Sequence, residues 1–230
     1  MGAMKRVIED YLKTIYDLYT TEGRVTTTAL AQRLKITPAS VTGMLKKLAR
    51  MNLVQYERYQ GVRLTPAGEQ IALEVIRHHR LIELFLAQAL NVPWDQVHEE
   101  AEKWEHVLSE EMEDRIDRWL GSPKTDPHGS PIPDKNGKIE EPPKVRLSEV
   151  GPSSQAVVAE VSDHDPELLR YLGKLNIYPQ TRLIILEIEP FDQSMHVQVG
   201  EQTHVLSALV TRCIWVTGVE SINRSNDAIS

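Results

Sequence analysis

The sequence predicts a mainly α-helical chain that ends in a small β domain. Apolar residues recur at helical spacing through most of residues 5–120. After a stretch rich in proline, glycine, lysine and aspartate at 121–145, short β-branched runs replace that spacing. With 230 residues, the chain can form one large domain or two small ones, each with a buried core.

Three helices are expected in the N-terminal part of the chain. The first spans residues 5–21, where apolar side chains form one stripe. A short second helix ends at Leu34 and follows a run of three threonines, which are favoured capping residues. The third is expected at 37–51, because Thr37 is a favoured cap and Pro38 a favoured first helical residue.

Two short strands around a turn follow these helices. They are expected at 53–58 and 62–64, before Thr65 begins a long helix that runs to about Leu90. A pair of helices joined by a tight turn and followed by a two-stranded hairpin is a winged helix-turn-helix. In that fold the helix at 37–51 would lie in the major groove of DNA.

The charge distribution favours a nucleic-acid partner for this winged segment. Residues 1–72 hold 11 Lys/Arg against 6 Asp/Glu, which is +5, whereas the remaining residues carry −12 of a net −7. The alternative is that the winged domain docks a protein. Hydroxyls and small residues of the third helix suit base contacts, and basic side chains suit phosphates. The expected DNA-binding residues are Thr37, Ala39, Ser40, Thr42, Gly43, Lys46, Lys47, Arg58 and Arg63.

Residues 98–106 hold two histidines and four glutamates. They fall in a helix expected from about Val97 to about Leu120. Glu102, Glu105 and His106 stand at i, i+3 and i+4, so their side chains leave the same face of that helix. Such groups repel one another unless a cation lies between them.

A second histidine-containing cluster lies upstream. His78 and His79 are followed by Glu83, which is four residues after His79 and therefore on the same helical face. The alternative for both clusters is a solvated acidic helix face. The occurrence of two such clusters in one chain favours a metal site.

The C-terminal region is expected to be a small β domain. A helix at 165–175 interrupts it, and the single cysteine, Cys213, lies in its last apolar run and is expected to fill the core. The expected strands are at 156–161, 182–189, 196–199, 204–206 and 208–216.

Several classes of protein are disfavoured by composition. One cysteine excludes an internal disulfide and a multi-cysteine zinc site. The sequence shows neither an apolar run approaching the roughly 20 residues of a membrane span nor a signal-peptide pattern. We therefore expect a cytoplasmic protein that has no membrane partner.

Taken together, these residues resemble the diphtheria-toxin-repressor family of metal-dependent transcriptional regulators, and within it the manganese-responsive branch. The resemblance covers nearly the whole chain and depends on the order and spacing of several motifs. These motifs lie at 9–16, 37–42, 64–68, 77–81 and 104–109, with a Pro-x-Pro segment at 129–133.

The resemblance implies three domains: a winged helix-turn-helix that binds DNA, a helical domain for dimerisation and metal binding, and a C-terminal SH3-like β-barrel. The expected bounds are 5–72, 73–140 (with a linker) and 145–220, followed by a tail at 221–230.

The resemblance also implies a functional metal site. Its ligands would be Asp10, Glu102, Glu105, His106 and His79. Family members tuned to iron generally have methionine where this chain has Asp10 and cysteine where it has Glu102. Hard oxygen ligands in place of sulfur favour Mn²⁺, with Fe²⁺ as the alternative. Some manganese-responsive members have a glutamate where this chain has Lys13, so a two-metal centre built with that glutamate is not expected.

A second, ancillary site is implied by the same resemblance. His79, Glu83 and His98 match its ligands, and His79 could serve either site. A carboxylate of the C-terminal domain often contributes, and the loop at 162–167 is the expected donor. Within that loop we expect Asp165, while Asp163, His164 and Glu167 stay open.

The expected function is that of a metal-dependent repressor that binds palindromic, double-stranded operator DNA as a homodimer when metal-loaded and controls metal-uptake genes. One alternative is a hydrolytic metalloenzyme, although the sequence contains no nucleophile or oxyanion motif to support it. Another is a DNA-binding protein that needs no metal.

Overall fold

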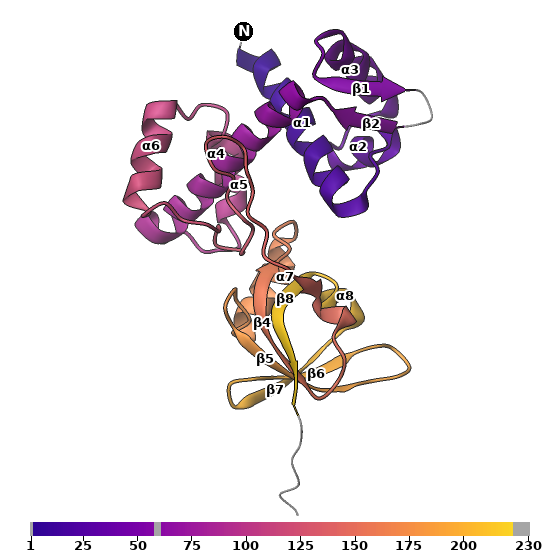
Figure 1. Ribbon diagram of the computed structural model, residues 1–230, viewed down its shortest axis with the longest axis vertical. Helices are drawn as coiled ribbons and strands as arrows, with labels where there is room; N and C mark the ends of the chain where they lie inside the picture. Colours follow the sequence, from indigo (N-terminus) through magenta and orange to yellow (C-terminus); the bar gives the residue numbers. More distant parts are fainter. Residues whose placement is uncertain (1, 58–60, 223–230) are drawn as a thin grey trace, which may run out of the picture. The chain divides into compact units, whose positions relative to one another are not determined.

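The computed structural model of the chain describes residues 2–57 and 61–222 (Figure 1). Two compact units divide the chain. The first comprises the chain up to Ile82 together with Glu102–Trp119 and Ile132–Ile139. The second comprises Glu83–Ala101, Leu120–Pro131 and the chain from Glu140 onward.

The three N-terminal helices of the first unit share one core. They are α1 (Gly2–Glu22), α2 (Thr27–Arg33) and α3 (Pro38–Arg50). The fully buried Leu12, Ile15, Leu30, Leu45 and Leu48 belong to this core. The threonines before α2 and α3 cap them, because each side-chain oxygen accepts a hydrogen bond from a backbone N–H three residues on. The predicted helices are confirmed.

A two-stranded wing follows α3. Strand β1 (Val54–Glu57) pairs antiparallel with β2 (Gly61–Leu64), and Val62 forms an isolated bridge with Val25. This arrangement confirms the predicted winged helix-turn-helix. Arg58, one of the residues expected to contact DNA, lies outside the described residues.

Helix α4 (Pro66–Leu90) begins at a cap made by Thr65, whose hydroxyl accepts from Gly68 N at 3.2 Å. Gly68 packs directly against the wing. A Cβ at this position would lie 2.0 Å from the carbonyl oxygen of Leu53, so only glycine fits there.

The single helix predicted from Val97 to Leu120 is wrong. Helix α5 (Val97–Trp104) ends in a turn, and α6 (Glu110–Trp119) begins after it. The break occurs because Ser109 acts as a new cap: its hydroxyl accepts from Met112 N at 3.3 Å. Val107, in the turn, is 80% exposed.

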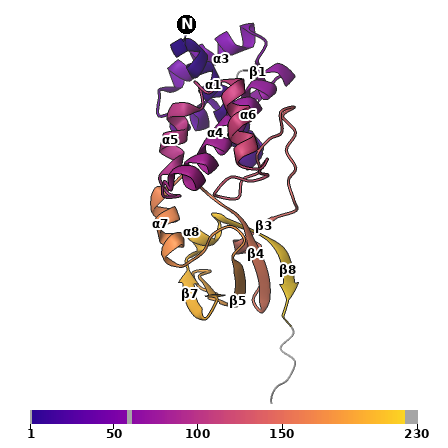
Figure 2. The same cartoon turned by 90° about the vertical axis from the view of Figure 1, so that its left-hand side faces the viewer.

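The second unit contains a six-stranded antiparallel sheet in the order β3-β8-β4-β5-β6-β7 (Figure 2). Helix α7 (Pro166–Lys174) lies between β4 and β5 in the chain, and a short 3-10 turn, Leu147–Glu149, follows β3. The strands are β3 (Val145–Arg146), β4 (Ser154–Val161), β5 (Arg182–Ile188), β6 (Met195–Val199), β7 (Gln202–Leu206) and β8 (Ile214–Ser221).

The last predicted strand, at 208–216, is wrong in its first half. Ser207 caps a short helix, α8 (Ala208–Thr211), by accepting from Val210 N, and β8 begins only afterwards. Cys213 lies between the two elements and is half-buried, so it only partly fills the core as expected. None of the helices in the described part of the chain is both long and apolar enough to span a membrane.

The proline- and glycine-rich segment at 121–145 contains an ordered loop at its centre, held by hydrogen bonds. The Asp126 carboxylate accepts from the backbone N–H groups of His128 and Ser130 at 2.8 and 3.0 Å. Val161 N of β4 donates to His128 O at 2.9 Å. A Cβ on Gly129 would lie 2.0 Å from Ala159 O, so glycine is needed for this close approach.

Candidate metal centres and nucleic-acid interface

The first unit contains a group of ionisable side chains that we call the first cluster. Its members come from α1, α4, α5 and the turn after α5, so the fold joins residues far apart in the sequence. They are Glu9, Asp10, Lys13, His79, Glu102, Glu105 and His106.

On one side of the first cluster, Asp10, Glu105 and His106 face a common point. One ligand atom from each lies within 4.8 Å of the others. His106 Nε2 lies 2.7 Å from Asp10 Oδ1 and 3.3 Å from Glu105 Oε1. Among the described residues, no hydrogen-bond partner is found for the buried Glu105 Oε1, and the buried His106 Nε2 has the Asp10 carboxylate as its ion-pair neighbour. Two buried, facing donor atoms of this kind fit a divalent cation.

Glu9 contacts the ring nitrogen of His106 that points away from Asp10. His106 Nδ1 lies 2.8 Å from Glu9 Oε2. A carboxylate on Nδ1 directs Nε2 toward a metal, which is the usual arrangement of metal-binding histidines. Burial alone would lower the pKa of His106, but hydrogen bonds to Asp10 and Glu9 raise it. A bound divalent ion would take the place of the Nε2 proton.

On the other side of the first cluster lies Lys13. Its Nζ donates to Glu102 Oε1 at 2.8 Å and to Glu105 Oε2 at 2.7 Å, and it lies 3.1 Å from His79 Nδ1. Burial alone would lower the pKa of Lys13, but the charges of Glu105 and Glu102 raise it well above its usual value. The side chain is therefore a charged ammonium in a mostly buried position.

Glu105 is the centre of this arrangement. Its side chain is completely buried, and burial alone would raise its pKa. The hydrogen bond from His79 and the charge of Lys13 lower the pKa of Glu105 to about 2. Glu105 is thus a carboxylate that faces Lys13 with one oxygen and His106 with the other.

A buried ionic network holds the backbone at Glu105. His78 lies between Glu105 O, at 3.2 Å from Nδ1, and Glu113 Oε2, at 3.0 Å from Nε2. Arg77 donates to Glu113 Oε1 at 2.5 Å and to Pro133 O at 2.7 Å. The turn that carries Glu105 and His106 is therefore held against α4 and α6.

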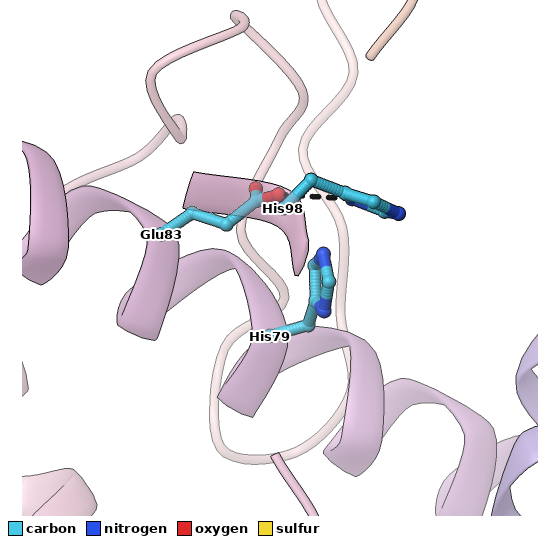
Figure 3. Close-up of side chains that lie close together, drawn as sticks. All are labelled: His79, Glu83 and His98. Carbon is cyan, nitrogen blue, oxygen red and sulfur yellow. Dashed lines mark hydrogen bonds and ion pairs between the residues drawn. The ribbon is translucent and has the colours of Figure 1, made fainter. Parts of the chain in front are cut away.

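The second unit contains a separate group, the second cluster, which consists of Glu83, His98, His128 and Asp163. Glu83 and His98 point toward one another, with Glu83 Oε1 at 3.2 Å from His98 Nδ1 (Figure 3). Glu83 Oε2 lies 3.7 Å from His128 Nδ1, and His98 Nδ1 lies 3.7 Å from Asp163 Oδ2. Glu83, His128 and Asp163 offer ligand atoms within 4.8 Å of one another.

The charges within the second cluster are strongly coupled. Burial alone would lower the pKa of His128, but the Glu83 carboxylate raises it to about 9. Burial alone would raise the pKa of Asp163, but a hydrogen bond from His164 and the charge of His98 hold it well below its usual range. This set of two carboxylates and two imidazoles, which contains no sulfur, fits a divalent transition metal.

Two residues of the second cluster differ from the expected set. Sequence reasoning missed His128, which is completely buried and whose Nε2 lies 2.8 Å from Trp94 O. The signal available was a histidine inside a Pro- and Gly-rich segment. Asp165, the expected loop donor, instead caps α7 by accepting from Glu167 N at 2.8 Å. Asp163, one of the open alternatives, is the loop residue beside Glu83.

The remaining expected ligands are His79 and Glu102, and both contact Lys13 of the first cluster. His79 contacts Glu105 and Lys13 of the first cluster and lies one turn before Glu83 on α4 (Figure 3), so the expectation that it serves either site stays open. Glu102 contacts Lys13, and its carboxylate is grouped with His79 and Glu105, whereas Asp10 is grouped with Glu105 and His106.

Most of the expected DNA-contacting residues form an accessible surface on α3. Thr37, Ala39, Ser40, Gly43 and Lys46 are exposed, and Arg63 is exposed on β2. Thr42 and Lys47 are half-buried. Thr42 donates to Pro38 O at 2.9 Å, and Lys47 Nζ lies 2.9 Å from Met4 Sδ. The exposed hydroxyls and lysine suit a nucleic acid.

Three family models match successive parts of the chain. Residues 3–62 match the "Iron dependent repressor, N-terminal DNA binding domain". Residues 65–134 match the "Iron dependent repressor, metal binding and dimerisation domain", and residues 145–218 match the "FeoA domain".

Individual proteins give the same result. The "Iron-dependent repressor IdeR" of Mycobacterium leprae (strain TN) is 32% identical in an alignment of 202 residues that covers 80% of this chain and 86% of the relative. A solved "Manganese-dependent transcriptional repressor complex with manganese" superimposes with a TM-score of 0.86 at 36% identity, covering 91% of this chain and 98% of that one. The structure of "ScaR with bound Cd2+" gives a TM-score of 0.79 at 33% identity, covering 94% and 99%.

A winged helix-turn-helix combined with buried carboxylate–imidazole clusters defines the class of metal-dependent DNA-binding regulators. Within that class, the chain belongs to the diphtheria-toxin-repressor family, whose members include the iron-dependent repressors. Its three parts are a winged-helix domain, a helical dimerisation domain and a C-terminal SH3-like sheet domain. Members of the family are transcriptional repressors and not enzymes, so the hydrolytic alternative is set aside.

Proposed function

We propose that the chain is a Mn²⁺-dependent repressor that binds palindromic operator DNA as a homodimer in the cytoplasm and represses metal-uptake genes. One observation carries the choice of metal. Asp10, Glu105 and His106 offer carboxylate oxygen and imidazole nitrogen, and none of these three donors is a sulfur ligand. Hard oxygen ligands suit Mn²⁺, whereas thiolate and thioether ligands select softer ions.

Fe²⁺ is the second candidate. The relatives named as iron-dependent repressors match 80% of this chain, and imidazole and carboxylate also bind Fe²⁺. The solved structures support both Mn²⁺ and a wider range of ions, because they include a manganese complex and a Cd²⁺ complex.

The first cluster offers a route from metal to DNA. Asp10 belongs to α1, whose buried Leu12 and Ile15 share the core that contains Leu45 and Leu48 of α3. An ion bound by Asp10 and His106 would therefore hold α1, and with it α3, in one position relative to the turn after α5. Such an ion acts on DNA binding only through its preference for the binding-competent state.

The energy required is moderate. Moving the population from mostly incompetent to mostly competent needs a preference of about 5.5 kcal/mol for one state. A dimer places two recognition helices on successive turns of the major groove, so the operator should be a palindrome. The second cluster would hold a further ion through Glu83, His98, His128 and Asp163, which supports a structural or tuning role.

The test is operator selection with chelator-stripped protein. Purified protein would be mixed with a random DNA library and Mn²⁺, anaerobic Fe²⁺, Zn²⁺ or chelator, and bound DNA would be sequenced. We expect enrichment of a palindrome with Mn²⁺ and none with chelator. Asp10→Ala should lose this metal dependence, whereas Asp17→Ala, on the same helix but outside the first cluster, should retain it. Equal enrichment with chelator and with Mn²⁺ would contradict the proposal.

A further inference from the structure

We propose that the Lys13 ammonium is a built-in cation that fills one of two cation positions in the first cluster, so that this cluster accepts one divalent ion per subunit. The inference rests on the proposed function, because it assumes that the first cluster binds an ion. It concerns what limits the number of ions and assigns Glu102 to Lys13 rather than to the metal.

Lys13 is surrounded by side chains that are potential metal donors. His79, Glu102 and Glu105 offer ligand atoms within 4.8 Å of one another, so by geometry alone these three residues could form a metal site. The Lys13 nitrogen lies among them, at 3.1, 2.8 and 2.7 Å. Two of the three ammonium N–H groups donate to the carboxylates of Glu102 and Glu105, and His79 Nδ1 is a close neighbour of both Lys13 and Glu105.

Lys13 and its partner Glu105 are largely withdrawn from solvent. The Lys13 side chain is 13% exposed, and its partner Glu105 is not exposed at all. A charge withdrawn from water to this extent must be paired and hydrogen-bonded. Lys13 meets this requirement only by remaining among these acidic partners, so the ammonium is a fixed part of the cluster.

Glu105 lies between two places where a cation fits, one occupied by Lys13 and the other beside His106. Its Oε2 accepts from Lys13, while its Oε1 lies 3.3 Å from His106 Nε2, on the side that Asp10 faces. The same carboxylate would therefore lie between the ammonium and a bound ion. In a cluster with two metal ions, a bridging carboxylate would have the same place.

The charges of the first cluster balance with one ammonium and one divalent ion. Asp10, Glu102 and Glu105 bring three negative charges, which one ammonium and one divalent ion balance. Glu9 does not disturb this count, because its carboxylate lies 3.3 Å from Lys5 Nζ as well as beside His106. A second divalent ion beside an intact ammonium would add uncompensated positive charge at close range, which is unfavourable in a buried site.

The first experiment counts ions. Chelator-stripped wild type, Lys13→Gln and Lys13→Glu would be titrated with Mn²⁺ by calorimetry, and the bound metal measured after dialysis. Both Lys13 variants should bind one more Mn²⁺ per subunit than the wild type, because loss of the ammonium opens the site of His79, Glu102 and Glu105. Lys103→Gln, an exposed lysine next to Glu102 in sequence, is the matched control and should bind the wild-type number.

Electron paramagnetic resonance would then test where the extra ion lies. Two Mn²⁺ ions that share Glu105 are spin-coupled, so the Lys13 variants should lose the sharp hyperfine lines of isolated Mn²⁺, and the wild type should keep them. An unchanged ion count in both Lys13 variants would overturn the inference.

The second experiment uses the wild type alone, so it does not depend on whether a variant folds. The ¹⁵N signal of the Lys13 ammonium would be followed while diamagnetic Cd²⁺ is added. We expect the signal to persist at saturation, because the ammonium and the ion occupy different positions. Loss of the signal on Cd²⁺ binding would show that the ion displaces Lys13 and would overturn the inference.

The two proposals fail in distinguishable ways. If Asp10→Ala binds as many ions as the wild type, the first cluster holds no ion and the proposed function fails. If Asp10→Ala loses an ion while the Lys13 variants gain none, the proposed function stands and only the role of Lys13 is overturned.

Discussion

His128 Nδ1 lies 3.7 Å from Glu83 Oε2, and both side chains are completely buried. The two residues are distant in sequence, on α4 and on the loop before β3, and the loop geometry around Asp126 fixes His128 in place. Because His128 Nδ1 is buried, faces this carboxylate and has no hydrogen-bond partner among the described residues, it is well placed to bind a metal ion.

His128→Ala is therefore expected to weaken ion binding at the second cluster by at least about tenfold, because it removes one of the donors. The measurement is calorimetric titration with Cd²⁺. His196→Ala is the control, since His196 lies in the same unit on β6 and pairs with Glu189 at 3.2 Å, away from the cluster. Equal Cd²⁺ affinity in wild type and His128→Ala would remove His128 from the site.

The two glutamates of the first cluster should differ sharply in their effect on Mn²⁺ binding. Glu105→Gln removes a fully buried carboxylate that faces the ion position, so we expect a loss of roughly 3 kcal/mol or more. Glu102→Gln removes a partner of Lys13 whose side chain is 41% exposed, so its effect should be below about 1 kcal/mol.

This comparison is made by Mn²⁺ titration of both variants under identical conditions. Their thermal unfolding without metal provides the control, because it separates loss of an ion ligand from general destabilisation. Equal losses of Mn²⁺ affinity would mean that Glu102 binds the ion together with Glu105.

The sequence predicted the parts of this structure that local chemistry determines. The Thr37-Pro38 pair predicts the start of α3, and the helix begins at Pro38 as predicted. The break at Trp104 was missed, because the acidic and apolar pattern continues through it and only Ser109 marks the new start. Helical periodicity alone therefore placed Glu105 and His106 in a helix when they lie in a turn.

The candidate metal centres were predictable only in part. Spacing along a helix links Glu105 to His106, but it cannot show that Lys13 lies between residues that are 66 to 92 positions away. His128 depends on a loop whose shape follows from Asp126 and Gly129 packing against β4. Such long-range contacts are consequences of the tertiary fold, which residue spacing does not encode.

Glu113 should make stability depend on pH under acidic conditions. Burial alone would raise its pKa, but His78 and Arg77 lower it from 4.5 to about 2. A carboxyl group with a lowered pKa stabilises the folded state above pH 4.5, and that contribution is lost as the pH falls toward 2. At 1.36 kcal/mol per pKa unit, the loss is about 3 kcal/mol at most.

The measurement is the unfolding free energy of metal-free protein between these pH values. Glu113→Gln should be less stable than the wild type at neutral pH and should show a flatter pH dependence. Glu111→Gln is the control, because Glu111 is exposed and pairs with Arg115 one turn away. Parallel pH profiles for wild type and Glu113→Gln would exclude this origin of the acid sensitivity.

Gly43 offers a way to separate DNA binding from folding. Nothing lies within 4 Å of a Cβ built at this position in the middle of α3, so alanine fits the fold. Gly43→Ala should raise stability by up to about 1 kcal/mol, because glycine is a poor helix former. If α3 lies in the major groove, the added methyl group should weaken operator binding by about 1–3 kcal/mol through steric overlap.

Thermal unfolding and operator titration with Mn²⁺ present would give both quantities for Gly43→Ala. Lys46→Ala provides the contrast: an exposed lysine that contacts phosphate should lower affinity on all sequences and reduce the salt dependence by about one unit. Gly43→Ala should leave that salt dependence unchanged, since it alters shape and not charge. A more stable Gly43→Ala protein that binds the operator as tightly as the wild type would show that DNA does not approach α3 at this position.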